Sequence, residues 1–113
     1  FLESYKRSGR YRGEIVKALK EAGLPEEISW LPLIESGFKI RALSRSRAFG
    51  LWQFIPSTGY KYGLNRDLYI DERMNVEKST QAAIAFLDRS LTLRETSSAA
   101  VANILMVSRL MVR

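Results

Sequence analysis

The chain has 113 residues, of which 46% are apolar and 27% charged, as is typical of a single globular domain. It contains no cysteine and no histidine, which excludes disulfide scaffolds, thiolate nucleophiles, Cys/His zinc sites and histidine-based catalytic triads. The net charge of +6 favours a polyanionic partner, such as nucleic acid, anionic lipid or an acidic wall polymer.

The predicted elements are helices. Apolar residues at helical spacing predict an amphipathic helix over residues 14–22, which ends at Gly23. Pro25 opens a second helix, with a distortion at Pro32 and an end near Gly37. A polar and basic connection follows over residues 39–47.

Two further helices are predicted after this connection. Pro56 starts a short helix that ends near Gly63, and Asn75 caps a longer one. One face of the longer helix carries residues at helical spacing: Val76, Thr80, Ala83, Leu87 and Leu91. No segment alternates as a strand does and no internal repeat is present, so the predicted fold class is all-α.

The start of the chain favours a fragment of a longer protein. No apolar run is long enough to span a membrane, and the first residues do not form a signal peptide. The chain begins at Phe1 without an initiator methionine. We therefore expect targeting information to lie outside it.

Glu35 is the only carboxylate between Glu27 and Asp67, in a span with six lysine and arginine side chains. It follows the apolar residues 30–34, at the end of the second predicted helix. Apolar surroundings remove water from a carboxyl group and raise its pKa, to about 6 in known acid catalysts, so that it can donate a proton near neutral pH. The alternative is a surface carboxylate paired with a nearby arginine.

A second cluster, residues 50–56, places one amide among apolar and aromatic neighbours. In a carbohydrate cleft, Gly50 lets the backbone approach the ligand and Trp52 offers an apolar face to a sugar ring. The Gln53 amide both donates and accepts hydrogen bonds. The alternative is a core segment in which Gln53 caps a helix end, and the residues alone leave both interpretations open.

Together these motifs resemble a known family. Glu35-Ser36-Gly37-Phe38, then Ala42, Ser44 and Ala48, and then the stretch GLWQFIPSTG over 50–59 are similar to the soluble lytic transglycosylase (SLT) domain. The stretches WLPLI over 30–34, YGL over 62–64, DER over 71–73 and KST over 78–80 resemble the membrane-bound transglycosylase D type within it. The resemblance covers about 15–93. It implies a lysozyme-like helical fold for a single domain over 1–113.

The resemblance implies cleavage of the β-1,4 bond between N-acetylmuramic acid and N-acetylglucosamine in peptidoglycan, with a 1,6-anhydro product. Glu35 would protonate the glycosidic oxygen and then act as base on the muramyl C6 hydroxyl. Ser44 and Gln53 match substrate-contacting positions, Ser44 near the muramyl N-acetyl group. The predicted substrate-binding set also contains Gly50, Trp52 and Ser36. Of these, Ser36 would mainly orient Glu35.

The same resemblance implies a monomer that acts on peptidoglycan glycan strands in the bacterial cell envelope, without a metal or other cofactor. Ordinary glycosidases need two carboxylates flanking the bond. No second acid lies near Glu35 in sequence, which agrees with assistance from the acetamido group of the substrate. Asp67 and Asp71 can still approach Glu35 in space.

The sequence departs from the family pattern in two places. Lys39-Ile40-Arg41 stands where the family has an asparagine-proline pair. After Leu93 no Ala-Tyr-Asn-x-Gly motif follows, and Ala102-Asn103 is only a faint match. We therefore predict that 94–113 is a divergent or frame-shifted tail and that the domain is incomplete at its C-terminal end.

Three classes of function fit these observations. The first is an active lytic transglycosylase, with a lysozyme-like hydrolase as its chemical variant. The second is an inactive or truncated remnant that binds peptidoglycan. The third is a basic helical module that binds nucleic acid, which only the charge favours because no recognition-helix pattern is present.

Overall fold

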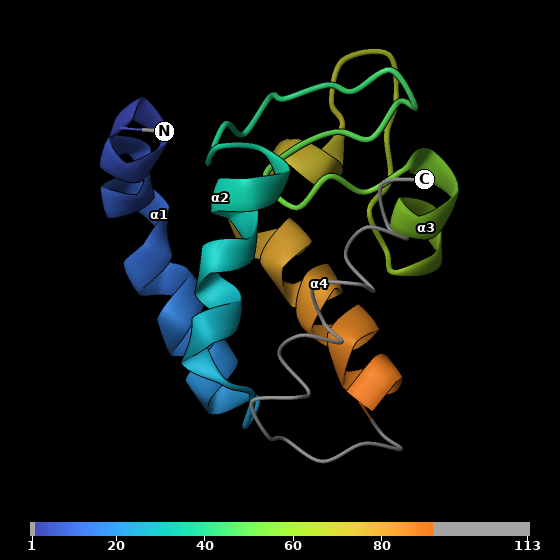
Figure 1. The fold of residues 1–113 in the computed structure, drawn as a ribbon. Helices are drawn as coiled ribbons and strands as arrows, with labels where there is room; N and C mark the ends of the chain where they lie inside the picture. Colours follow the sequence, from blue (N-terminus) through green and yellow to red (C-terminus); the bar gives the residue numbers. More distant parts are fainter. Residues whose placement is uncertain (1, 92–113) are drawn as a thin grey trace.

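The computed structural model describes residues 2–91, with side chains to residue 88 (Figure 1). Its elements in chain order are α1 (Leu2–Glu21), η1 (Glu26–Trp30), α2 (Leu31–Glu35), α3 (Pro56–Lys61), η2 (Glu72–Met74) and α4 (Val76–Leu91), where η marks a 3₁₀ helix. Pairing of extended backbone within this part of the chain is limited to isolated bridges, such as the one between Phe49 and Phe54. The predicted all-α class is confirmed, whereas the predicted tail over 94–113 lies outside the described residues.

Helix α1 begins at Leu2, well before the predicted start at residue 14. Its N-terminal half is held by contacts with the segment that carries α2. The Tyr5 ring stacks on Trp30 with 6.1 Å between ring centroids, and Arg7 Nε donates a hydrogen bond of 2.9 Å to the Gly37 carbonyl. Tertiary contacts of this kind override weak helix propensity.

The second predicted helix is two helices that join end to end. The 3₁₀ helix η1 passes directly into α2 at Leu31. Pro32 lies in the first turn of α2, where its missing N–H costs no hydrogen bond, so the distortion falls before the proline and not at it. The helix ends at Glu35, and Gly37 follows in the left-handed region with φ +62°. This agrees with the predicted end near Gly37.

The two later helices begin where their sequence signals predict. Pro56 is the first residue of α3, and the Asn75 side chain accepts a 2.8 Å hydrogen bond from the Lys78 backbone N–H at the start of α4. On the predicted inner face of α4, the side chains of Thr80, Ala83 and Leu87 are buried. None of the described helices is both long and apolar enough to cross a bilayer.

One cluster of buried apolar side chains joins these elements. Helix α1 contacts η1, α2 and α4, and Figure 1 shows η1 and α2 running alongside α1. The cluster contains Ile15, Leu19, Leu24, Ile28, Leu31, Phe38, Leu51, Trp52, Phe54, Leu64, Ala82, Ala83, Ile84 and Leu87. Because Leu31 at the start of α2, Phe38 shortly after its end and the 50–54 segment share this core, the packing fixes α2 relative to that segment.

Candidate active site

Glu35 is the last residue of α2. It is half-buried, and the helix that it ends is anchored in the core by the buried residues Leu31 and Pro32. The helix, whose first residues lie in the apolar core, therefore places the Glu35 carboxyl group at the start of the connection that follows. This is the position that the sequence predicts for Glu35.

Ser36 joins the end of α2 to the second motif. Its hydroxyl donates a 2.7 Å hydrogen bond to the Leu51 carbonyl and also lies 3.1 Å from the Pro32 carbonyl. Since Ser36 is bonded directly to Glu35 in the chain, these contacts restrain the backbone that carries the carboxylate. The two motifs that stand out in the sequence therefore meet in space.

Gly50 lies in a turn that only glycine can form. Its φ is +92°, and a Cβ at this position would lie 2.0 Å from the Arg73 carbonyl oxygen. The sequence motif predicts that Gly50 lets backbone approach a ligand. The close approach is instead made by the chain's own backbone at Arg73, so the requirement for glycine comes from internal packing.

Gln53 is buried, with 3% of its area exposed, and it holds two segments together. Its Nε2 donates to the Ala42 carbonyl at 2.8 Å and to the Gly50 carbonyl at 2.9 Å. The side chain therefore does not cap a helix end. Its φ of +54° is in the left-handed region, which costs about 1–3 kcal/mol for a residue other than glycine and is often found at functional sites.

Trp52 packs in the core and is only 3% exposed. Its indole Nε1 donates a 3.0 Å hydrogen bond to the Thr80 hydroxyl on α4. In this conformation the ring has too little open area for a sugar to stack on it, contrary to the expectation for this residue. The contact instead anchors the 50–54 segment to α4.

Ser44 belongs to a tight turn in the connection after α2. Its hydroxyl accepts a 3.1 Å hydrogen bond from the Ala48 N–H and lies 3.0 Å from the Ser46 hydroxyl. Two residues earlier, the Ala42 carbonyl accepts hydrogen bonds from Gly50 N and from Gln53. The turn that contains Ser44 is therefore tied to the 50–54 segment, which also accepts the hydrogen bond from Ser36 next to Glu35.

Arg73 supports this arrangement, although no sequence motif predicts a role for it. Its side chain is 4% exposed, and Nη1 donates to the carbonyls of Arg47 at 2.7 Å and Phe54 at 2.8 Å. Nε and Nη2 bind the Asp71 carboxylate at 3.0 Å and 2.6 Å. Arg73 thereby connects both ends of the 47–54 segment to η2. The Asp-x-Arg spacing in the sequence is too common to predict such a buried pair.

The Asp71 and Asp67 carboxylates are both used in other contacts. Partial burial acts to raise the pKa of Asp71, but hydrogen bonds from Arg73 and the charges of Arg73 and Arg66 outweigh it and hold that pKa below its ordinary value. Asp67 accepts hydrogen bonds from the N–H groups of Tyr69 and Ile70, each 2.8 Å long, and these lower its pKa. Neither acid is placed as an uncommitted partner for Glu35.

A hollow of about 480 Å³ lies between the residues after α3 and the outer face of α4. Its lining includes Tyr62, Asn65, Glu72 and Gln81, but none of the predicted site residues. Within residues 2–91, no group of acidic side chains is arranged to hold a metal ion. The candidate site is therefore defined by the junction of Glu35 and Ser36 with the 50–54 segment.

Comparison with known families identifies this helical domain: the chain belongs to the transglycosylase SLT domain family. The family model matches residues 14–103. The match therefore includes residues 94–103, which the motifs alone assign to the tail.

The relatives agree with this assignment. The chain is 40% identical over 83 residues to "Membrane-bound lytic murein transglycosylase D" of Escherichia coli K12, and equally so to the protein of that name in E. coli O6:H1. It is 35% identical over 82 residues to a "Putative tributyltin chloride resistance protein" of Alteromonas sp. strain M-1. These alignments cover 74% and 73% of this chain but only 18% and 40% of the respective relatives, so the chain spans a minor part of each relative's length. The predicted resemblance to the D type is confirmed.

Proposed function

We propose that the chain acts as a lytic transglycosylase on the glycan strands of peptidoglycan, with Glu35 as the single general acid and base. Family membership supports the reaction class, and the name of the E. coli relative supports murein as the substrate. The observation that carries the assignment of Glu35 is the hydrogen bond from Ser36 to the Leu51 carbonyl, which joins the end of α2 to the second motif. The proposed location is the bacterial cell envelope, and the proposed functional form is a monomer.

The proposed reaction has two proton transfers at one carboxyl group. Protonated Glu35 gives its proton to the glycosidic oxygen between N-acetylmuramic acid and N-acetylglucosamine, and the C1–O bond breaks. The resulting carboxylate then removes the proton of the muramyl C6 hydroxyl. The C6 oxygen bonds to C1, which closes the 1,6-anhydro ring and returns Glu35 to its protonated form. No water is consumed, and no metal or cofactor takes part.

A mechanism with one carboxylate agrees with the contacts of the other acids. An ordinary glycosidase places a second carboxylate beside the bond. Asp71 is paired with buried Arg73, and Asp67 caps two backbone N–H groups. The acetamido group of the muramyl sugar is therefore the proposed partner that stabilises positive charge at C1.

Gln53 and Ser44 are the proposed substrate contacts, and the other residues of the set position them or Glu35. An amide nitrogen has two protons, and Gln53 gives both to backbone carbonyls, so its Oε1 is the atom that we assign to a substrate hydroxyl or N–H. Ser44 is the proposed contact to the muramyl N-acetyl group. Ser36 orients Glu35, while Gly50 and Trp52 shape the turn that presents Gln53.

Product analysis tests this proposal. Purified sacculi are incubated with the protein, and the soluble muropeptides are analysed by mass spectrometry. We expect products that end in 1,6-anhydro-N-acetylmuramic acid. Reducing-end products would instead show a lysozyme-like hydrolase, and binding to sacculi without release would show a peptidoglycan-binding remnant.

A further inference from the structure

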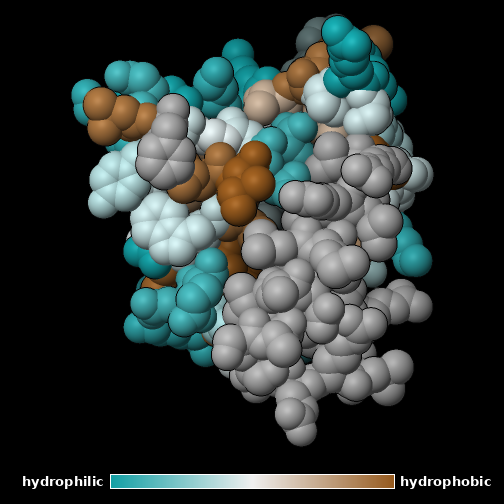
Figure 2. Space-filling model, in the orientation of Figure 1, coloured by the Kyte–Doolittle hydropathy of each residue, from teal (hydrophilic) through white to brown (hydrophobic). Residues whose placement is uncertain are grey.

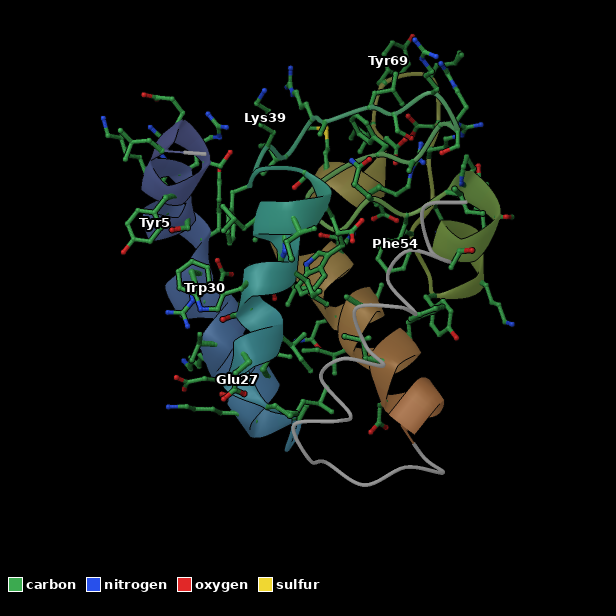
Figure 3. All side chains as sticks on the ribbon, in the orientation of Figure 1. Tyr5, Glu27, Trp30, Lys39, Phe54 and Tyr69 are labelled. Carbon is green, nitrogen blue, oxygen red and sulfur yellow. The ribbon has the colours of Figure 1, made fainter. Side chains whose placement is uncertain are left out.

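The turn between α3 and η2 presents three consecutive large apolar side chains to solvent. Leu68 is 93% exposed, Tyr69 92% and Ile70 60%. Figure 3 shows Tyr69 at the outer edge of the molecule, away from the helices. We call residues 67–70 the apolar tip. A contiguous exposed apolar patch commonly marks an interaction surface.

The apolar tip is held in its shape by hydrogen bonds. Asp67 Oδ1 accepts the N–H groups of Tyr69 and Ile70, each at 2.8 Å, and the Asp67 N–H donates to the Ile70 carbonyl at 2.8 Å. Arg66 and Asp71 form a bridge at the base of the turn. The backbone therefore directs these side chains outward in the free protein, and binding through them requires little further ordering.

The surroundings of the apolar tip are basic. Arg66 precedes it and is exposed, as are Arg45 and Arg47 on the connection after α2. That connection is linked to the base of the tip through Arg73, which donates a hydrogen bond to the Arg47 carbonyl and is paired with Asp71. Residues 36–66 contain no carboxylate. After the tip, Asp71 is paired with Arg73 and Glu72 with Lys78, and within it the Asp67 carboxylate accepts two backbone N–H groups. Figure 2 shows hydrophilic side chains along this upper edge, with hydrophobic ones among them.

We propose that the apolar tip inserts into the surface of an anionic phospholipid bilayer. Leu68 and Ile70 would enter the boundary of the acyl chains, and the tyrosine ring suits the headgroup level because one end is apolar and the other polar. Arginines beside a shallow apolar insertion are attracted by anionic headgroups. A protein partner is a poorer fit, since a single protruding turn offers little flat area. The proposal does not depend on the chemistry at Glu35.

Vesicle sedimentation tests the proposal. The parent should bind vesicles of equal parts phosphatidylcholine and phosphatidylglycerol, and bind pure phosphatidylcholine at least tenfold more weakly. The double substitution Leu68→Ser, Ile70→Ser should weaken binding to the anionic vesicles at least tenfold. Tyr60→Ser is the matched control, because Tyr60 is also exposed, at 49%, but lies on α3. It should bind within twofold of the parent.

A single label gives an independent test, because the chain has no cysteine. An environment-sensitive dye on Leu68→Cys should brighten with anionic vesicles, whereas the same dye on Tyr60→Cys should not. The proposal is overturned if the parent does not bind anionic vesicles or if the double variant binds as well as the parent. It is also overturned if both labels respond alike, or if the double variant loses only binding to sacculi.

Discussion

Replacing Arg73 with methionine should destabilise the fold strongly. The guanidinium makes hydrogen bonds to the carbonyls of Arg47 and Phe54 and an ion pair with Asp71. Removal of one partner from a buried ion pair costs about 3–5 kcal/mol. The Asp71 side chain is 21% exposed, so water can compensate part of this loss, and we expect a decrease of about 3 kcal/mol in the free energy of unfolding.

Urea unfolding followed by circular dichroism measures this quantity directly. The matched control is Arg41→Met, which removes an exposed arginine that does not act on Asp71 and should change stability by less than about 0.5 kcal/mol. A decrease below about 1 kcal/mol for Arg73→Met would show that the two carbonyls and Asp71 find other partners. Arg73 would then not be the support of the 47–54 segment.

Three further changes test the same region. Gly50→Ala should cost about 3 kcal/mol or more in urea unfolding, because the new methyl group would lie 2.0 Å from the Arg73 carbonyl at a φ of +92°; a loss under about 1 kcal/mol would contradict this. Ser36→Ala removes the 2.7 Å hydrogen bond to Leu51 and should cost about 1 kcal/mol of stability, with a loss of turnover of about tenfold or more that the melting temperature does not explain. Asp71 has a lowered pKa in the folded protein, so its stabilising contribution is complete above its unfolded-state pKa and is lost as the pH falls through the folded-state pKa. The difference in unfolding free energy between the parent and Asp71→Asn should therefore shrink between about pH 6 and pH 2, and a constant difference would contradict the pairing.

Local signals in the sequence predict where helices begin and end, because these boundaries depend on interactions between residues close together in the chain. Pro56 and Asn75 begin helices because one has a preset φ and the other supplies a capping oxygen, and Gly37 follows a helix end because it tolerates positive φ. The position of Glu35 at the end of an apolar helix also follows from such signals. The contact between the Glu35-Ser36 motif and the 50–54 segment is expected from the family resemblance and not from the spacing of these residues in the sequence.

Features decided by distant contacts are not predictable in this way. The first half of α1 depends on Trp30 and Gly37, which lie far along the chain. Trp52 can face solvent or the core equally well by its local sequence, and its burial depends on Thr80. The need for glycine at position 50 comes from the Arg73 backbone, which no local pattern reveals.

Glu35 is proposed to carry out both proton transfers, and a pair of variants tests this role most directly. Glu35→Gln keeps the size of the side chain but cannot donate or accept the proton. Glu27→Gln makes the same change at an exposed carboxylate on η1, labelled in Figure 3. The amount of anhydro-muropeptide released from sacculi should be unchanged in Glu27→Gln and should fall to background in Glu35→Gln, with circular dichroism showing both variants folded. Release by Glu35→Gln at the rate of the parent would contradict the assignment.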